Sequence, residues 1–162
     1  MKFPLIFFIA GLLSQQLSGF GQNVNSTTYV LLLELLLESE ITQIAVEQTP
    51  NDALFIDART IEEYDVSHIK GALHINSPED PRLQNISKNK TIIVYCSIGL
   101  RSESLCEELK TMGFNDVYNL FGGIFEWVND GSAIYNHKGP TLEVHGYNYF
   151  WAFWLDKGTK VY

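Results

Sequence analysis

The sequence predicts an α/β fold, in which a parallel β-sheet is flanked by helices on both faces within a single domain. Three observations indicate this fold. Short apolar segments rich in β-branched residues alternate along the chain with segments of helical periodicity. The length of 162 residues suits one domain with one core. The composition, 46% hydrophobic and 19% charged residues, is that of a globular rather than a disordered chain.

The first 21 residues predict a secretory signal peptide. The stretch MKFPLIFFIAGLLSQQLSGFGQ has one positive charge at Lys2, an apolar run from Phe3 to Leu13, and small residues near its end. The alternative is a membrane anchor, but a membrane-spanning helix needs about 20 apolar residues and this run is shorter. We therefore expect an exported protein, periplasmic in a bacterium or otherwise secreted, without a membrane contact after cleavage.

The rest of the chain divides into alternating helices and strands. A leucine-rich amphipathic helix is predicted over 28–39, with Glu34 and Glu38 on its exposed stripe. Strands are predicted where short apolar segments end at turns or polar residues: 44–46, 54–56, 72–75, 91–95 and 117–120. Further helices are predicted over 60–64, over 101–112 and from 124 onward.

Two of these helices carry clear end signals. Thr60 and Glu63 have the spacing of a capping box at the start of the short helix. In the helix over 101–112, Leu105, Leu109 and Met112 fall on one face, and Gly113 ends it. We expect that face to pack against the sheet.

The polar residues Asp57 and Cys96 each follow a predicted buried strand. Ligands of parallel α/β sheets bind beyond the carboxyl ends of the strands. The sequence therefore places both side chains at the edge of the sheet where chemistry is expected.

The loop from Cys96 to Arg101, CSIGLR, has the features of an anion-binding loop. Gly99 allows a tight curl of the backbone. Successive N–H groups of a curled loop, together with those of the following helix N-terminus, form a concavity that favours an anion. Arg101 adds positive charge, and such surroundings favour the thiolate form of a cysteine. The alternative is that Cys96 is a buried thiol without a chemical role.

The other cysteine and the histidines suggest no further centre. Cys106 lies beside Leu105 and Leu109 on the helix, so we expect it to fill the core. A Cys96–Cys106 disulfide is conceivable in an oxidising compartment, but the two positions are poorly placed for disulfide geometry. The four histidines lack zinc-ligand spacing, and we expect no metal and no cofactor. The net charge of −8 disfavours nucleic acid as a partner.

Two blocks of the sequence resemble the single-domain rhodaneses, a family of sulfurtransferases. The block LFIDARTIEEYDVSHIKGALHI, 54–75, is similar to the family's D-x-R, E-[FY] and G-H-I-x-G-A pattern. The block IIVYCSIGLRSESLCEELKTMGFNDVYNLFGGIFEW, 92–127, is similar to its C-x-x-G-x-R-[ST] loop, helix, strand and G-G-x-x-x-W ending. With the preceding helix, the resemblance predicts a rhodanese-like domain over 28–130.

The resemblance implies a reaction in two half-steps. Cys96 would accept a sulfane sulfur from a small sulfur-containing anion such as thiosulfate, or from a persulfide. It would then pass that sulfur to cyanide, to a low-molecular-weight thiol or to a protein acceptor. The persulfide-binding loop would consist of Ser97, Ile98, Gly99, Leu100 and Arg101.

The resemblance also implies supporting residues around this loop. Arg59 and Glu63 would form an ion pair behind the loop, Asp57 would orient nearby backbone groups, and Ser102 occupies the [ST] position. Many members that act on thiosulfate have a basic residue where this chain has Ser97.

Two other functions are weighed against sulfur transfer. Phosphatases of the same superfamily, like its arsenate reductases, bind a tetrahedral oxyanion, and the phosphatases use a C-x5-R loop. Here only four residues separate Cys96 from Arg101, which favours sulfur chemistry. A non-catalytic or redox-sensing binding module of the family is the other alternative.

The segment 131–162 lies beyond the resemblance and contains the aromatic stretch YNYFWAFWL, 147–155. We expect it to fold back over apolar surface of the domain and to bury Trp151 and Trp154. A contact with a partner or a membrane is the alternative.

Overall fold

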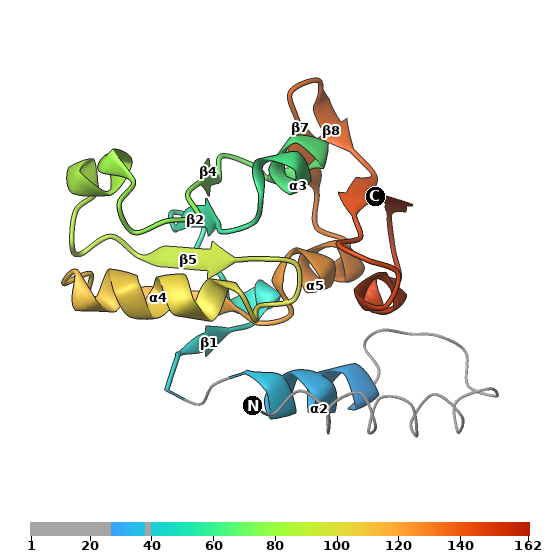
Figure 1. Ribbon diagram of the computed structural model, residues 1–162, viewed down its shortest axis with the longest axis horizontal. Coiled ribbons are helices and arrows are strands. Elements are labelled where there is room, and N and C mark those ends of the chain that lie inside the picture. Colours follow the sequence, from blue (N-terminus) through green and yellow to red (C-terminus); the bar gives the residue numbers. More distant parts are fainter. Residues whose placement is uncertain (1–26, 38–39) are drawn as a thin grey trace.

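The computed structural model describes residues 27–37 and 40–162 (Figure 1). The predicted signal peptide, 1–21, lies outside the described residues, as does the predicted end of the first helix at Ser39. In the part of the chain that is described, no helix is long and apolar enough to cross a membrane.

A parallel sheet forms the centre of the molecule. Its strands, in spatial order, are β1 (Gln43–Ile44), β6 (Val117–Leu120), β5 (Ile92–Tyr95), β2 (Leu54–Asp57) and β4 (Leu73–His74). All neighbouring pairs are parallel. The central strand β5 is buried along its whole length, as its run of apolar residues predicts. Cys96 directly follows this strand.

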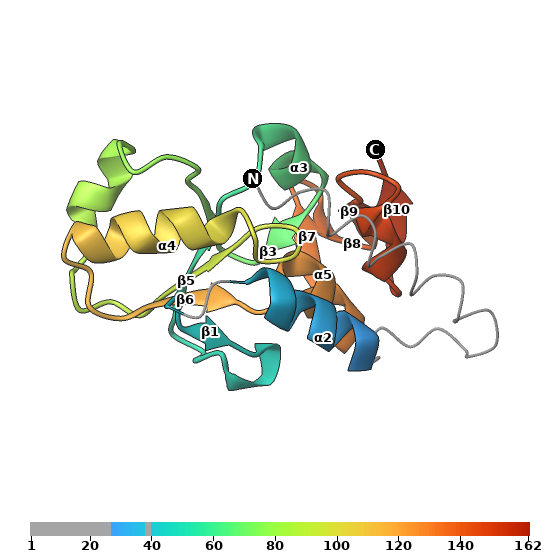
Figure 2. The same ribbon diagram turned by 60° about the horizontal axis from the view of Figure 1, so that its bottom comes forward.

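Helices cover both faces of the sheet, which confirms the predicted fold class. They are α2 (Thr27–Leu36), α3 (Ile61–Val66), α4 (Ser102–Thr111) and α5 (Gly123–Asp130). Helix α4 runs along β5 on one face (Figure 1), and α2 lies over α5 on the other (Figure 2). The alternating side chains of β5 divide the core, because neighbouring residues of a strand point to opposite faces. Ile92 and Val94 belong to the α4 side, and Ile93 and Tyr95 to the α5 side.

Most predicted elements form within a few residues of their expected bounds. The capping box of Thr60 and Glu63 is confirmed at the start of α3. On α4, Leu105 and Leu109 are buried as expected, but Met112 is exposed at the C-cap. The strand expected over 44–46 was placed too late. It covers Gln43–Ile44, and a 3₁₀ turn, η1 (Val46–Gln48), follows it.

Outside the central sheet lie short strands that the sequence did not predict, most of them in the C-terminal segment. Strands β3 (His68–Ile69), β7 (Ile134–Asn136) and β8 (Gly139–Thr141) form an antiparallel sheet, and β9 (Glu143–His145) pairs in parallel with β10 (Thr159–Val161). A 3₁₀ turn, η3 (Trp151–Trp154), lies between the last two strands. A third 3₁₀ turn, η2 (Pro81–Asn85), lies at the end of the molecule opposite the C-terminal segment (Figure 1).

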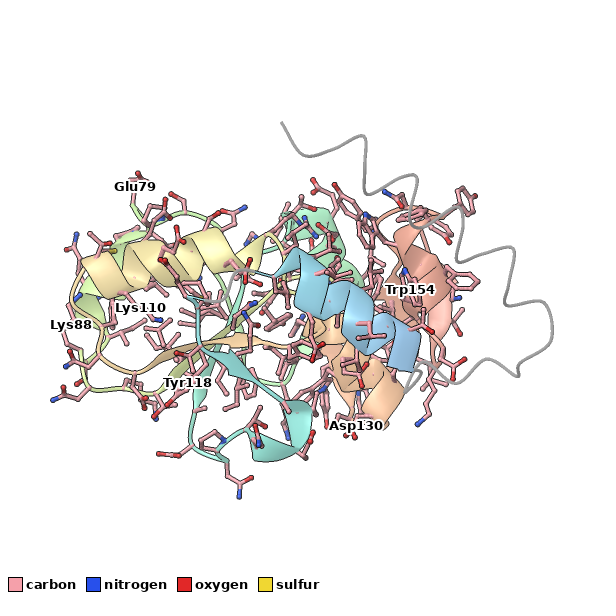
Figure 3. All side chains as sticks on the ribbon, turned by 90° about the horizontal axis from the view of Figure 1, so that it is seen from below. Glu79, Lys88, Lys110, Tyr118, Asp130 and Trp154 are labelled. Carbon is pink, nitrogen blue, oxygen red and sulfur yellow. The ribbon has the colours of Figure 1, made fainter. Side chains whose placement is uncertain are left out.

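The C-terminal segment, 131–162, packs on the α5 side of the domain. Val144 and Leu155 are fully buried and belong to the same apolar cluster as β5 and α5. The ring of Trp154 stacks on Tyr29 of α2, with 5.1 Å between ring centroids. Figure 3 shows Trp154 beside α2, at the opposite end of the molecule from Lys88 and Lys110. Trp151 and Trp154 are partly buried rather than fully buried as expected.

Candidate active site

Cys96 lies at the carboxyl end of the central strand and starts a tightly curled loop. Its side chain is 1% exposed, and both cysteines are free thiols. The backbone N–H of Gly99 donates a hydrogen bond to the Cys96 Sγ atom over 3.2 Å. The loop therefore curls around the sulfur, which is the arrangement that the sequence predicts.

Gly99 makes this curl possible. Its φ angle of +99° lies in the region that strains any residue with a side chain. Its carbonyl oxygen points away from the sulfur, where it accepts from Ser102 Oγ at 3.0 Å and from Asn119 Nδ2 at 2.9 Å. Asn119, fully buried on β6, was not anticipated as a site residue; its signal is an amide within the otherwise apolar strand VYNL. These contacts fix the peptide group after Gly99, while the N–H in the peptide group before it donates to Cys96.

The other amides of the loop are candidates for binding an anion. The N–H groups of Ser97, Ile98, Leu100 and Arg101 donate none of the backbone hydrogen bonds found in the described loops and turns. Helix α4 starts directly after the loop, and its first N–H groups face the same end of the sheet. A charged sulfur or an oxyanion placed here would be stabilised by these dipoles.

Arg101 at the end of the loop is bound to Glu63 of α3. Its Nη1 and Nη2 atoms donate to the two carboxylate oxygens at 2.9 and 2.7 Å, and Nη2 also donates to Ser97 Oγ at 2.9 Å. Ser97 Oγ in turn donates to the carboxylate at 3.0 Å. Burial alone would raise the pKa of Glu63, but the hydrogen bonds and charge of Arg101 outweigh it and lower that pKa to about 2. Arg101 thus fixes the loop, while Glu63 offsets its positive charge.

The expected ion pair between Arg59 and Glu63 is wrong. Arg59 instead binds Asp57, through Nε at 2.9 Å and Nη2 at 2.7 Å, and both side chains are fully buried. Two residues at the end of a strand are close enough for this bidentate pair, which leaves Glu63 to Arg101. Asp57 also accepts from the Arg59 N–H at 3.0 Å, so it does orient neighbouring backbone.

The Asp57–Arg59 pair lies next to the loop without reaching the sulfur. Arg59 Nη2 donates to the Ser67 carbonyl oxygen at 2.6 Å, and its guanidinium carbon lies 5.7 Å from the centroid of the Tyr95 ring. The pair therefore supports the end of β5 from which Cys96 projects.

The start of α5 holds the backbone of Cys96 and Ser97 through two hydrogen bonds. Ile124 N–H donates to the Cys96 carbonyl oxygen at 2.9 Å, and Phe125 N–H donates to that of Ser97 at 3.1 Å. A methyl group on Gly123 would lie 2.4 Å from the Cys96 oxygen, so this contact requires a glycine. The two backbone bonds fix the position from which the loop starts.

Cys106 has no part in this arrangement. It is fully buried among apolar residues of α4 and the sheet, as expected of a core residue. Burial raises the pKa of its thiol to about 12. Cys106 is therefore a poor nucleophile at neutral pH.

Across residues 27–37 and 40–162, no three His, Cys, Asp or Glu side chains are grouped so that they could hold a metal ion.

Comparison with known families gives a match over the region that builds this site. The family model for the rhodanese-like domain matches residues 42–130, more than half of the chain. Among curated proteins, tRNA uridine(34) hydroxylases of Escherichia coli are 39% identical over 83 residues. That alignment covers 47% of this chain and 24% of the hydroxylase, so the chain spans about a quarter of the length of these relatives.

Solved structures share the fold at lower identity. A protein of Bacillus halodurans is 22% identical with a TM-score of 0.53, covering 72% of this chain and 89% of its own. A rhodanese-related protein from Thermoplasma volcanium is 23% identical with a TM-score of 0.52, and the match covers 57% of this chain and 96% of that protein. A thiosulfate sulfurtransferase from Pseudomonas aeruginosa is 23% identical with a TM-score of 0.51, and the match covers 70% of this chain and 23% of that protein. These similarities establish the fold.

Proposed function

The chain belongs to the family of rhodanese-like domains, and on this premise we propose that it is a sulfurtransferase in which Cys96 carries the transferred sulfur. The observation that carries the proposal is the geometry of the loop. A free thiol accepts a hydrogen bond from the Gly99 N–H at 3.2 Å, and the other N–H groups of the loop donate none of the backbone hydrogen bonds found in the described loops and turns.

The reaction would have two half-steps that balance without an external oxidant or reductant. The Cys96 thiolate attacks the outer sulfur of thiosulfate, the S–S bond of thiosulfate breaks, and its electron pair leaves with sulfite. An acceptor such as cyanide or a thiolate then attacks the outer sulfur of the persulfide. The new S–S bond breaks, and its electron pair returns to the Cys96 sulfur.

The amides of the loop would lower the energy of both half-steps. The persulfide and the thiolate carry negative charge on sulfur, and pre-oriented N–H dipoles stabilise such charge without reorganising. Because Glu63 offsets the charge of Arg101, we assign this stabilisation mainly to the backbone. Arg101 acts by holding Ser97 and the loop in place.

A phosphatase or arsenate reductase is disfavoured by the same contacts. Four residues separate Cys96 from Arg101, one fewer than in the C-x5-R loop that accommodates a phosphate. Arg101 also directs both terminal nitrogens at Glu63, which leaves them poorly placed to bind an oxyanion above the sulfur. A cradle of this size suits a single sulfur atom.

We propose small sulfur compounds and low-molecular-weight thiols as the partners, with a protein thiol as the alternative acceptor. The relatives that hydroxylate tRNA share only about a quarter of their length with this chain. The net charge of −8 gives little attraction for a polyanion. Nucleic acid is therefore not part of the proposal.

The experiment is a steady-state transfer assay with matched cysteine variants. Thiocyanate formation from thiosulfate and cyanide, and persulfide transfer to glutathione, are measured for wild type, Cys96→Ser and Cys106→Ser. We expect Cys96→Ser to lose at least about a thousandfold in rate, because it lacks the sulfur carrier. Cys106→Ser should retain most of the activity.

Release of phosphate from p-nitrophenyl phosphate by the same samples tests the phosphatase alternative. Transfer that survives in Cys96→Ser would contradict the proposal. So would an absence of transfer with every donor and acceptor, which would leave a binding module.

A further inference from the structure

Helix α2 and the residue that follows it cover one side of the cysteine loop. A methyl group on Gly99 would lie 3.5 Å from Leu37 Cδ2, and one on Gly122 would lie 3.4 Å from Leu33 Cδ1. These leucines, just after and within α2, therefore press on the cysteine loop and on the turn before α5. Tyr29, one turn earlier, is buried and stacks on Trp154. Helix α2 therefore obstructs approach to the loop from this side.

The loop is accessible at its other end. Within it, Cys96 is 1% exposed and Ser97 and Ile98 are buried, whereas Leu100 is 40% exposed and the Arg101 side chain 34% exposed. A substrate that reaches the sulfur without moving α2 must therefore pass beside Arg101.

Tyr147 lies at this point of approach. Its ring centroid is 4.6 Å from the guanidinium carbon of Arg101, and its side chain is 46% exposed. Tyr147 belongs to the C-terminal segment, outside the residues 42–130 that match the family model. A residue of the extension thus covers the accessible end of the cysteine loop.

The backbone holds Tyr147 in this place at an energetic cost. Among the described residues other than glycine, Tyr147 has the only positive φ angle, +61°, a conformation that is unfavourable for a residue with a side chain. Its N–H donates to His145 Nδ1 at 3.0 Å. The preceding Gly146 N–H donates to the Val161 carbonyl oxygen at 2.9 Å, and its Cα is packed so closely that an added methyl would lie 2.9 Å from Ala152 Cβ. The turn is therefore rigid.

We propose that Tyr147 is a specificity-determining residue, which narrows the approach to Cys96 so that small acceptors pass and bulky thiols are disfavoured. The inference rests on the proposed sulfurtransferase function and adds a size limit to its acceptors. The ring, stacked on Arg101 and fixed by its strained turn, occupies the space that a bulky acceptor would need beside the loop.

The kinetic test compares a small and a bulky acceptor in matched variants. Tyr147→Gly removes the ring and suits the positive φ angle, so the fold is preserved. Tyr147→Phe keeps the stacking. Tyr149→Ala is the control, because Tyr149 is 81% exposed in the same segment and its ring packs on Tyr162. We expect Tyr147→Gly to raise kcat/KM for glutathione about tenfold and to leave that for cyanide within about twofold. Tyr147→Phe and Tyr149→Ala should resemble wild type.

A second measurement tests whether Tyr147 restricts access to Cys96, without relying on sulfur transfer. Cys96 is alkylated in a Cys106→Ser background with iodoacetamide and with a bulky pyrene maleimide, and the ratio of the two rates is followed. Tyr147→Gly should raise the relative rate of the bulky reagent. An unchanged ratio, or an equal change in Tyr149→Ala, would overturn the inference. If the ratio rises while wild type shows no Cys96-dependent transfer, the size limit stands and the proposed function fails.

Discussion

Glu63 connects the cysteine loop to the rest of the molecule through a single carboxylate. Its oxygens accept from both terminal nitrogens of Arg101, from Ser97 Oγ, and from the N–H of Thr60 at 3.1 Å. The same side chain therefore completes the capping box of α3 and holds both ends of the loop. A buried carboxylate with this many donors is stabilised in its charged form.

Replacing Glu63 by Gln should destabilise the fold by about 2 kcal/mol at pH 7, because Arg101 loses its charged partner at a buried site. The lowered pKa of Glu63, about 2, gives the sign of the pH dependence. The ion pair contributes fully above the ordinary pKa of a glutamate and is lost as pH falls toward 2. The difference between wild type and Glu63→Gln, measured by urea denaturation at pH 7, 5 and 3, should therefore shrink at the lowest pH.

Glu62→Gln is the matched control, since Glu62 is the exposed neighbour on the same helix. Its effect on the denaturation midpoint should be small. An equal loss in both variants would show that the Glu63–Arg101 pair does not hold the loop.

At this scale the sequence predicts the cysteine loop better than it predicts the ion-pair partners of the residues around it. Cys96, Gly99 and Arg101 follow from spacing alone, because the loop chemistry depends on their order along the chain. The sequence could not show which acid binds Arg59 and which arginine binds Glu63, since two arginines and two acids lie within reach of each other. The fold selects Asp57–Arg59 and Glu63–Arg101 by geometry.

At the scale of elements, the turn into α5 positions the cysteine. Gly122 and Gly123 both have positive φ angles, and the N–H groups that follow donate to the carbonyl oxygens of Cys96 and Ser97. Helix α5 can approach the cysteine backbone this closely only because Gly123 has no side chain. The contact links the last helix of the family domain to the cysteine loop.

Gly123→Ala should destabilise the protein by about 2–4 kcal/mol and lower the rate of persulfide formation, because an added methyl meets backbone atoms of Cys96 and Ser97. Gly71→Ala is the control. Gly71 also has a positive φ angle, +75°, but an added methyl would meet nothing within 4 Å. It should cost only about 1 kcal/mol and leave the rate unchanged. Thermal unfolding and single-turnover kinetics measure both effects. Equal losses in the two variants would contradict the role given to Gly123.

The long elements could be predicted from the sequence, and the short ones could not. Strands β5 and β6 and helix α4 have apolar patterns long enough to specify them. Strands of two or three residues, such as β3 and β9, contain too few positions for a periodic pattern. They form because a neighbouring strand supplies the hydrogen-bonding partner.

At the scale of the whole molecule, elements outside the family match contact the cysteine loop and the turn before α5. Helix α2 and the segment beyond residue 130 meet where Tyr29 stacks on Trp154 (Figures 2 and 3). Leu155 and Val144 extend the core cluster of the sheet, so the segment is part of the folded body. The sequence predicted that the aromatic stretch would cover apolar surface. It gave no sign that Tyr147 would lie against Arg101, because contacts between distant segments depend on the finished fold.

The central claim is that one sulfur atom of this chain, that of Cys96, carries the transferred sulfur within its amide-lined loop. The most direct test is the intact-mass spectrum of Cys106→Ser after treatment with thiosulfate and removal of the excess. We predict a mass gain of one sulfur atom, which cyanide then removes, and no gain in Cys96→Ser treated in the same way. A gain that persists in Cys96→Ser, or that is absent from Cys106→Ser, would contradict the account.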